Sequence, residues 1–358
     1  MTSIGAAQAA IFRGTEQGFD IKEYDVPEPG PGQALLKVEL TGICGTDAHI
    51  YDVGNASPMA LGHEISGRVV TLGEGVDRDY TGRPISEGDL IVPHPRAGEG
   101  GRYGFRNDAL AGPPHFTGGF GQYLSVCYPG SALFRVDAEP HIAVLLEPFA
   151  VALHAVDRAN IRVGDTVVVQ GTGAIGLFAI FLARKAGAVN VIAVGGPAGR
   201  LEVAAALGAD VLIDIAEHPD GAERTKLVLE ETPGGLGADV VIECAGVKSA
   251  VTEGLDYTRQ SGTFCEVGHF IDTGEITINP NRHLVLKNIN LVAPYGSNVE
   301  HFRRGRAVLE KDGAILEQVV SHRVPLTRLD EAIGALLGRY HLDGRDAVKI
   351  AVDPWAAA

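Results

Sequence analysis

The sequence is poor in cysteine and has no long apolar run, and both shortages exclude classes of protein. Its four cysteines are Cys44, Cys127, Cys244 and Cys265. They are too few and too scattered for a disulfide framework, so we expect a reducing, cytoplasmic location, with the last three cysteines in the core. No apolar run reaches the ~20 residues that a membrane span needs. The opening residues lack the basic start of a signal peptide, so none is expected.

Basic residues are also in the minority. The chain has 30 Lys and Arg against 45 Asp and Glu, a net charge of −15. This balance disfavours nucleic acid and anionic membranes as partners. With 45% hydrophobic and 21% charged residues in 358, the chain has the composition of a globular protein, and a prior of ~100–200 residues per domain predicts two domains.

Helical periodicity is scarce in the first 150 residues. Short β-type runs broken by Gly and Pro predict a β-rich domain there. The segment 94–119 has no clear period and is expected to be a long surface loop. The β-type runs are 34–40, 64–72, 89–92 and 121–127.

Residues 165–295 have a different pattern. Short apolar runs alternate with helical segments such as 174–186, as in a parallel sheet buried on both faces. We therefore predict a doubly wound α/β domain over 156–296. A final strand at 348–352 is expected to return to the β-rich domain, which would then comprise 1–155 and 297–358. The predicted parallel strands are 166–170, 189–194, 211–214, 239–244, 263–267 and 289–293.

A glycine-rich turn follows the first of these strands. Gly171 permits the tight turn, Gly173 leaves space for a pyrophosphate, and Gly176 lets the helix approach the strand. The phosphates would lie on the helix N-terminus, where Ala174 and Ile175 begin the helix. A lone GxGxxG is weak evidence, but a strand before it and a helix after it predict dinucleotide binding.

The second strand of this domain lacks the acidic residue that binds an adenosine ribose. It ends in Val194, Gly195 and Gly196 instead. Arg200 follows closely and would contact a ribose, a 2′-phosphate or the adenine, or simply cap a helix. NAD and NADP therefore both stay open, and NAD is favoured because no second basic residue accompanies Arg200.

Four potential metal ligands are spread over the β-rich part. Cys44, His63, Glu64 and Glu147 offer the thiolate, imidazole and carboxylate groups that bind catalytic zinc. Each alone is ordinary, since a buried cysteine is usually core and a glutamate before proline often starts a helix. Their joint occurrence ahead of a dinucleotide fold indicates a metal centre.

These motifs together resemble the zinc-dependent medium-chain alcohol dehydrogenases, in particular the sorbitol, butanediol and threonine dehydrogenase branch. The resemblance covers essentially the whole chain and implies a GroES-like β domain joined to a Rossmann domain. It implies a catalytic zinc surrounded by Cys44, His63 and Glu147, with Glu64 bound to the metal or just behind it. The motifs are Gly42–His49, Gly62–Glu64, Glu147–Pro148, Gly171–Gly176, Cys244–Gly246 and Val267–Gly268.

The resemblance also implies roles near the metal and the cofactor. Thr46 takes the substrate proton, His49 is the outer end of the proton relay, and Asp47 orients a ligand histidine. His269 follows the fifth strand beside the expected nicotinamide and would touch cofactor or substrate, or be an ordinary loop histidine. The further cofactor residues expected are Gly195, Arg200, Ala245, Val267 and Gly268.

One departure from the family is clear. Many relatives hold a structural zinc with four cysteines in a lobe that corresponds to 94–119, and this segment has no cysteine. We therefore expect one catalytic zinc per chain and no structural zinc. His94 and His115 are expected to be loop histidines.

The predicted activity is reversible oxidation of a secondary alcohol, either a polyol or a cyclic or aliphatic alcohol, to a ketone with NAD(P). The alternatives are a zinc-independent quinone or enone reductase of the same superfamily and a non-enzymatic dinucleotide-binding regulator. A thiolate and one carboxylate neutralise Zn²⁺, so we expect only one of Glu64 and Glu147 to bind the metal at a time. The apolar edge strand 289–293 predicts a homodimer or homotetramer.

Overall fold

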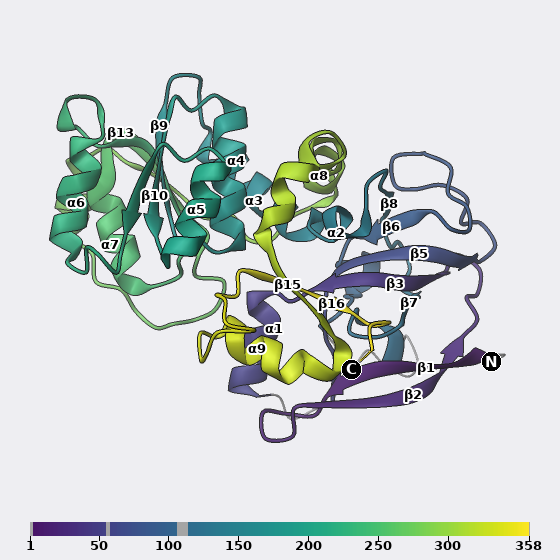
Figure 1. Cartoon of the computed structure of the whole chain (residues 1–358). Coiled ribbons are helices and arrows are strands. Elements are labelled where there is room, and N and C mark those ends of the chain that lie inside the picture. The colour runs from purple at the N-terminus through teal and green to yellow at the C-terminus, as the bar shows by residue number, and fades with distance from the viewer. Residues whose placement is uncertain (1–2, 55–57, 106–113, 358) are drawn as a thin grey trace. The chain divides into compact units, whose positions relative to one another are not determined.

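The computed structural model describes residues 3–54, 58–105 and 114–357. The chain divides into two compact units, Met1–Pro148 with Asn298–Ala358 and Phe149–Ser297 (Figure 1). The division falls within helix α3 (Leu146–Ala159) and just after residue 297, close to the predicted limits of 155 and 296.

The first unit is built on two sheets. A three-stranded antiparallel sheet has the order β2-β1-β4, and a seven-stranded sheet has the order β15-β16-β3-β5-β6-β8, with β7 paired to β3. The C-terminal strand β16 pairs with β3, so the chain returns to the first unit as predicted. The strands are β1 (Ser3–Phe12), β2 (Phe19–Pro27), β3 (Ala34–Gly42), β4 (Met59–Ala60), β5 (Glu64–Leu72), β6 (Leu90–Pro93), β7 (Tyr123–Val126), β8 (Leu133–Arg135), β15 (Val320–Pro325) and β16 (Lys349–Asp353).

Among the described residues of this unit, four α-helices lie beside the sheets together with the start of α3. They are α1 (Gly45–Val53), α2 (Pro140–Ala143), α8 (Val299–Asp312) and α9 (Leu329–Leu336). The helix predicted at 326–337 is a 3-10 turn, Leu326–Arg328, followed by α9. In the described part of 94–119 the structure has only two short 3-10 turns, Gly98–Gly100 and Pro114–Phe116, which fits the predicted loop; residues 106–113 lie outside the described part.

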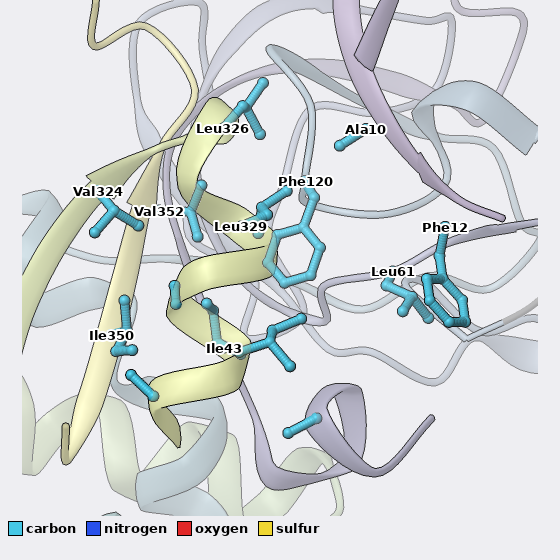
Figure 2. Packing of buried hydrophobic residues seen from close by; sticks show 14 of the residues in the cluster. Ala10, Phe12, Ile43, Leu61, Phe120, Val324, Leu326, Leu329, Ile350 and Val352 are labelled. Atoms are coloured by element: carbon cyan, nitrogen blue, oxygen red, sulfur yellow. The ribbon is translucent and has the colours of Figure 1, made fainter. Parts of the chain in front are cut away.

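The core of the first unit joins segments from both ends of the chain. Figure 2 shows α9 packed among side chains of β15, β16 and the N-terminal strand β1. Ile43 and Leu61 belong to this cluster and are fully buried. Burial of each contributes roughly 1.5–3 kcal/mol. Because these residues directly precede the segments at Cys44 and His63, the core fixes where those segments lie.

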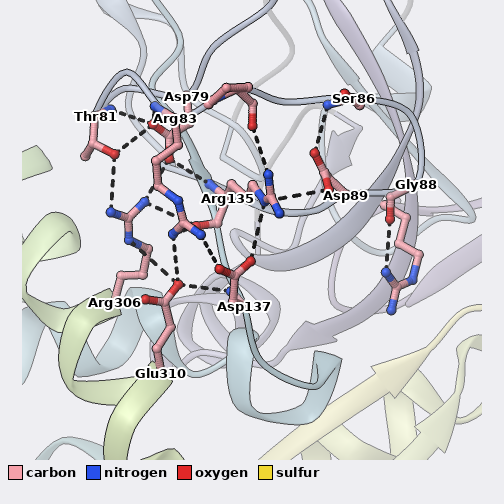
Figure 3. A network of polar contacts seen from close by, with 12 residues as sticks. Asp79, Thr81, Arg83, Ser86, Gly88, Asp89, Arg135, Asp137, Arg306 and Glu310 are labelled. Carbon is pink, nitrogen blue, oxygen red and sulfur yellow. Dashed lines mark hydrogen bonds and ion pairs between the residues drawn. The ribbon is translucent and has the colours of Figure 1, made fainter.

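A polar network holds helix α8 to the same unit (Figure 3). Arg306 donates to the buried Asp79 Oδ2 at 2.8 Å and to the carbonyl oxygen of Arg135 at 3.2 Å. Burial alone would raise the pKa of Asp79, but hydrogen bonds from Thr81, Arg83 and Arg135 lower it below its ordinary value. The ionised Asp79 therefore anchors α8 to the β-rich part.

The second unit is a six-stranded parallel sheet of order β11-β10-β9-β12-β13-β14. Helices α4 (Ala174–Ala186) and α5 (Ala198–Ala206) cover one face, and α6 (Gly221–Glu230) and α7 (Lys248–Tyr257) the other (Figure 1). The doubly wound α/β fold is thus confirmed. The strands are β9 (Thr166–Gln170), β10 (Asn190–Gly195), β11 (Val211–Asp214), β12 (Ala238–Glu243), β13 (Thr258–Glu266) and β14 (Asn290–Val292).

Sequence-predicted strands of this unit lie within a few residues of the observed ones. Strand β13 begins at Thr258, earlier than the predicted 263, because Arg259–Ser261 are polar and break the apolar pattern that the prediction used. Across the described ranges, no helix is both long and apolar enough to cross a bilayer.

Candidate active site

Three predicted metal ligands converge in the first unit. Cys44 lies at the N-terminus of α1, and Glu64 begins β5, directly after His63. Strands β3 and β5 are antiparallel neighbours with Gly42 opposite Glu64, so the end of one strand meets the start of the other. The three residues offer ligand atoms that all lie within 4.8 Å of one another. A Cβ on Gly42 would lie 2.0 Å from Glu64 Oε2, so a side chain at this position would displace the Glu64 carboxylate.

Asp47 connects the two segments that carry these residues. Its Oδ2 accepts a hydrogen bond from the Cys44 backbone N–H at 2.9 Å, and its Oδ1 accepts one from the Gly62 N–H at 3.3 Å. Oδ1 also lies 3.5 Å from His63 Nδ1. Burial lowers the pKa of His63, but the negative charges of Asp47 and Cys44 outweigh burial and raise that pKa well above its ordinary value. Asp47 therefore lies where the predicted orienting residue should be.

Lys349 is a member of the site that the sequence analysis missed. Its Nζ donates to Glu64 Oε1 at 2.6 Å, to Glu64 Oε2 at 2.8 Å and to the carbonyl oxygen of Ile43 at 3.0 Å. Both charged side chains are buried. Burial lowers the pKa of Lys349, but Glu64 and Cys44 raise it above its ordinary value. The sequence did offer a signal for this residue, because a lysine lies inside the apolar run that predicts the C-terminal strand.

Glu147 lies in the first turn of α3 and is also buried. Burial raises the pKa of Glu147 to about 7; His63 and Lys349 oppose the increase, and Glu64 adds to it. Glu147 therefore shares the electrostatic environment of the other predicted ligands. It is not one of the three residues that lie within 4.8 Å of one another.

The predicted proton-relay residues lie on α1. Thr46 Oγ1 is 3.7 Å from Cys44 Sγ. His49 follows three residues later, so the helix places both side chains on one face. The two residues are partly exposed. The helix that begins at Cys44 thus carries a hydroxyl beside the thiol and an imidazole one turn further along.

The cysteine-free loop is held by aromatic packing and close backbone contact. Tyr103 is fully buried, and its hydroxyl lies 2.6 Å from Ser131 Oγ. Gly104 has a positive φ of 74°, and a Cβ on it would lie 2.1 Å from the Gly62 carbonyl oxygen. Phe105 then stacks on the His63 ring, with centroids 4.3 Å apart and planes at 29°. The loop therefore places an aromatic ring against a predicted metal ligand.

The two histidines of this loop pack against aromatic rings. His94 lies 4.6 Å from Phe302, and His115 stacks on Tyr24 at 3.7 Å, measured between ring centroids. Among the described residues, neither belongs to a group of potential metal ligands. The side chain of His94 is buried, and that of His115 is partly buried.

The glycine-rich turn in the second unit forms a cradle at the start of α4. Gly171 has a φ of 88°, and a Cβ on Gly176 would lie 1.8 Å from the Gly171 carbonyl oxygen. A Cβ on Gly173 would meet no described atom within 4 Å, so this glycine faces open space at the helix N-terminus. Ala174 and Ile175 are the first two residues of that helix, whose N–H groups have no partner within the helix.

The other predicted cofactor residues lie at the same edge of the sheet. Gly195 ends β10, and Arg200 is in the first turn of α5. Ala245 follows β12, while 267–269 follow β13. Parallel strands end at a common edge, so the structure brings these predicted residues together.

The remaining cysteines are free thiols. Cys265 is buried in β13, and burial raises its pKa to about 12. Cys244 was predicted inside a strand and lies one residue past the end of β12; burial raises its pKa well above the ordinary value. Cys127 is partly buried against the core of the first unit. High thiol pKa values make Cys244 and Cys265 unreactive.

Two family descriptions match the chain. Residues 30–137 match the alcohol dehydrogenase GroES-like domain, and residues 174–311 match the zinc-binding dehydrogenase family. Among solved structures, an alcohol dehydrogenase of Thermotoga maritima has a TM-score of 0.88 at 27% identity and covers 98% of this chain and 99% of its own. A putative zinc-binding dehydrogenase of Sinorhizobium meliloti, bound to NADP, has a TM-score of 0.82 at 27% identity, with 98% and 100% covered.

Relatives of named activity match over nearly their whole length. The L-threonine 3-dehydrogenase of Saccharopolyspora erythraea is 31% identical over 332 residues, which are 91% of this chain and 94% of that protein. The 5-exo-hydroxycamphor dehydrogenase of Pseudomonas putida is 32% identical over 353 residues, 92% and 94% of the two chains. The chain therefore belongs to the zinc-dependent medium-chain alcohol dehydrogenase family, and it is an NAD(P)-dependent oxidoreductase that acts on CH–OH groups.

Proposed function

We propose that this chain oxidises a secondary alcohol to a ketone, reversibly, at a zinc ion held by the first unit. The observation that carries the proposal is that the ligand atoms of Cys44 and His63 lie together, within 4.8 Å of the lysine-paired Glu64, and that the buried Glu147 interacts electrostatically with His63 and Glu64. The relatives are named for substrates as different as threonine, sorbitol and 5-exo-hydroxycamphor, so a polyol and a cyclic alcohol both remain candidates.

The donor set fits zinc. Sulfur, imidazole nitrogen and carboxylate oxygen are the ligands of catalytic zinc sites, and here they are largely withdrawn from water. Cys44, His63 and Glu147 would hold the ion, because the charge of Glu64 is already paired with Lys349. One thiolate and one carboxylate balance the two positive charges. Zinc bound there supplies Lewis-acid chemistry, which polarises the oxygen of the alcohol or ketone.

The chain's own residues then orient the His63 imidazole and transfer the proton. Asp47 accepts a hydrogen bond from the Cys44 backbone N–H, and its Oδ1 lies 3.5 Å from His63 Nδ1, where its charge would favour one orientation of the imidazole. Thr46 Oγ1 would accept the hydroxyl proton of the substrate and give up its own hydroxyl proton in exchange. His49, one turn further on α1, is the outer acceptor that releases this proton to water.

The second unit would hold the nicotinamide cofactor, which supplies the hydride acceptor and donor. The cradle of Gly171, Gly173 and Gly176 at the α4 N-terminus has the shape and dipole for a pyrophosphate. Gly195, Ala245, Val267 and Gly268 would border the rest of the cofactor. NAD is favoured because Arg200 is the sole basic residue directly after β10, and NADP stays open.

The exposed edge of the parallel sheet supports self-association. β14 is an edge strand, and its Leu291 side chain is 55% exposed. An edge strand with exposed apolar side chains promotes aggregation of a monomer. Pairing with a second copy across a two-fold axis covers that edge. We propose a homodimer, or a homotetramer made of dimers, in a reducing cytoplasm that keeps the four cysteines free.

The experiment that tests this function combines metal analysis with a substrate screen. The purified chain should contain one zinc per chain and reduce NAD⁺ or NADP⁺ with members of a panel of polyols and cyclic alcohols. Chelation should abolish the activity, and added zinc should restore it. If the metal-free chain reduced quinones or enones as fast as the untreated chain does, the protein would instead be a zinc-independent reductase.

A substitution at Gly173 tests the cofactor cradle. Gly173→Val should raise the Kd for the nicotinamide cofactor at least about 100-fold, roughly 2.7 kcal/mol, because its side chain fills the space left for the pyrophosphate. The fold should survive, since a Cβ there meets nothing within 4 Å. Cofactor fluorescence titration and thermal unfolding measure the two effects. Gly30→Val, in the first unit and away from the predicted cofactor residues, is the control, because a Cβ there would make only ordinary contacts with the Gln33 side chain. An unchanged Kd in Gly173→Val would place the cofactor elsewhere.

A further inference from the structure

The end of β10 has no space for the acidic side chain that binds an adenosine ribose in many dinucleotide-binding folds. β10 ends at Gly195, which is buried, and a Cβ on it would lie 2.7 Å from Thr172 Oγ1 and 3.0 Å from the Thr172 backbone nitrogen. The Thr172 hydroxyl accepts a hydrogen bond from the Gly196 N–H and donates one to the Gly196 carbonyl oxygen, both at 3.1 Å. An acidic residue at 195 would therefore displace Thr172, which lies between two glycines of the phosphate cradle.

An acidic side chain reaches the same place from the neighbouring strand. β11 ends at Asp214, which is the register partner of Gly195 in the parallel pair of β10 and β11. The two strand ends stay together past this point, because the Ile215 N–H donates to the Gly195 carbonyl oxygen at 2.9 Å. A Cβ on Gly196 would lie 3.2 Å from Asp214 Oδ1. The Asp214 carboxylate therefore lies beside the first residue after β10, close to where the usual acid would stand.

This carboxylate is held in place by its own turn. Asp214 Oδ1 accepts a hydrogen bond from the Ala216 N–H at 2.8 Å, as an aspartate does at the start of a turn. The side chain is partly exposed, and an aspartate in contact with water carries a negative charge at neutral pH. A carboxylate accepts hydrogen bonds at both oxygens, so Oδ2 is an acceptor for a ligand while Oδ1 keeps the group in position.

The order of the strands relates this position to the adenosine ribose. In a doubly wound fold the pyrophosphate lies at the glycine turn after the first strand, and the adenosine ribose lies at the carboxyl end of the second. Here β9 is the first strand and β10 the second, and β11 lies on the other side of β10. The cradle of Gly171, Gly173 and Gly176 follows β9. A ribose bound in this way would lie at the end of β10, within reach of Asp214.

We propose that Asp214 selects the cofactor without a 2′-phosphate, because its carboxylate accepts a hydrogen bond from the ribose 2′-hydroxyl. The inference rests on the proposed function, which supplies the cofactor. A phosphate on that oxygen removes the hydroxyl proton and brings a second negative charge against the carboxylate. Arg200, in the first turn of α5, would by itself favour the 2′-phosphate. The two side chains thus lead to opposite expectations, and Asp214 predicts NAD.

The test compares the binding of ADP-ribose and of its 2′-phosphate, two probes that contain the adenosine ribose and no nicotinamide. Calorimetry at neutral pH and constant ionic strength gives both dissociation constants. Asp214→Asn removes the charge and retains an oxygen for the Ala216 N–H. Asp214→Ser, whose hydroxyl can also accept from that N–H, is the second variant in case the first fails to fold. Glu217→Gln removes one charge from an exposed side chain of the turn that follows β11 and is the matched control.

The unchanged chain should bind ADP-ribose at least about tenfold more tightly than its 2′-phosphate. Asp214→Asn should raise the Kd of ADP-ribose about fivefold and lower the Kd of the 2′-phosphate about tenfold, while Glu217→Gln should change each less than about twofold. Equal increases in both constants would mean a purely structural role for Asp214 and would overturn the inference. An unchanged chain that binds the 2′-phosphate as tightly as ADP-ribose, or more tightly, would also overturn it. A chain that binds neither probe nor NAD would overturn the proposed function as well.

A substitution at Gly195 tests the premise that the usual acid does not fit. Gly195→Asp should raise the Kd of both probes at least about tenfold and lower the temperature of thermal unfolding, because its side chain would displace Thr172. A Gly195→Asp chain that unfolds at the same temperature and binds ADP-ribose more tightly would show that the end of β10 accommodates its own acid. Asp214 would then not be the substitute for that acid, and the inference would be wrong.

Discussion

Replacing Lys349 by methionine should destabilise the first unit by about 3–5 kcal/mol, the cost of leaving a buried charge without its partner. Lys349 Nζ is bound to both oxygens of Glu64 and to the carbonyl oxygen of Ile43. Methionine fills a similar volume but offers no donor, so Glu64 and the Ile43 carbonyl group lose their partner. The free energy of unfolding, from denaturant titration of the metal-free chain, measures the loss.

Two further variants separate the charge from the packing. Lys349→Arg retains a cation and should recover part of the lost stability. Lys349→Met/Glu64→Gln removes both charges and should be more stable than Lys349→Met alone, because no buried charge is left unpaired. A double variant as unstable as the sum of the single variants would show that the pair is not coupled, contrary to the structure.

Lys349→Met also tests which of the two glutamates, Glu64 or Glu147, binds the metal. With Lys349 present, Glu64 is engaged and Glu147 is the carboxylate assigned to zinc. Lys349→Met frees Glu64, and a second carboxylate then competes for the ion. Zinc bound by a thiolate and two carboxylates would have a net negative charge, which opposes formation of an alkoxide. We expect kcat to fall while zinc content is retained.

Local motifs made most of the cofactor cradle predictable from the sequence. Its three glycines, the strand before them and the helix after them lie within a few residues, so spacing alone fixes their relation. The approach of Gly176 to Gly171 follows from that geometry. Likewise, His63 and Glu64 are adjacent, and their nearness to Cys44 follows once β3 and β5 are paired.

Lys349 was not predictable in the same way. It lies 285 residues from Glu64, and no sequence pattern states that β16 inserts beside β3. The apolar run 348–352 indicated a buried strand, and a lysine in such a strand requires a buried partner. That requirement was a usable signal, but it did not identify Glu64. Which carboxylate pairs with Lys349 depends on the order of the strands in the sheet, and that order is known only from the folded structure.

The nearness of Glu243 and Glu266, which end the neighbouring strands β12 and β13, could also have been predicted from the sequence. Each glutamate follows an apolar run that predicts a buried parallel strand, and consecutive strands of such a sheet end at one edge. Two acids at that edge had to be neighbours or nearly so. By contrast, the stacking of Phe105 on His63 depends on a loop without regular structure, and composition alone does not fix its course.

The largest effect on catalysis is expected from Cys44→Ser. Serine keeps the size of the side chain but is a hydroxyl at neutral pH, so it does not replace a thiolate as a zinc ligand. Zinc content should fall from one per chain to a small fraction, and kcat/KM should fall by a factor on the order of 10³ or more, about 4 kcal/mol of transition-state stabilisation.

The controls for Cys44→Ser use the division of the chain into two units. Cys127→Ser makes the same change at a partly buried cysteine of the first unit and should retain zinc and activity. The Kd for the cofactor should be unchanged in both variants, because the glycine cradle lies wholly in Phe149–Ser297. If Cys44→Ser retained both its zinc and its rate, the metal would be held elsewhere. The convergence of Cys44, His63 and Glu64 would then be a feature of packing rather than the centre of the reaction.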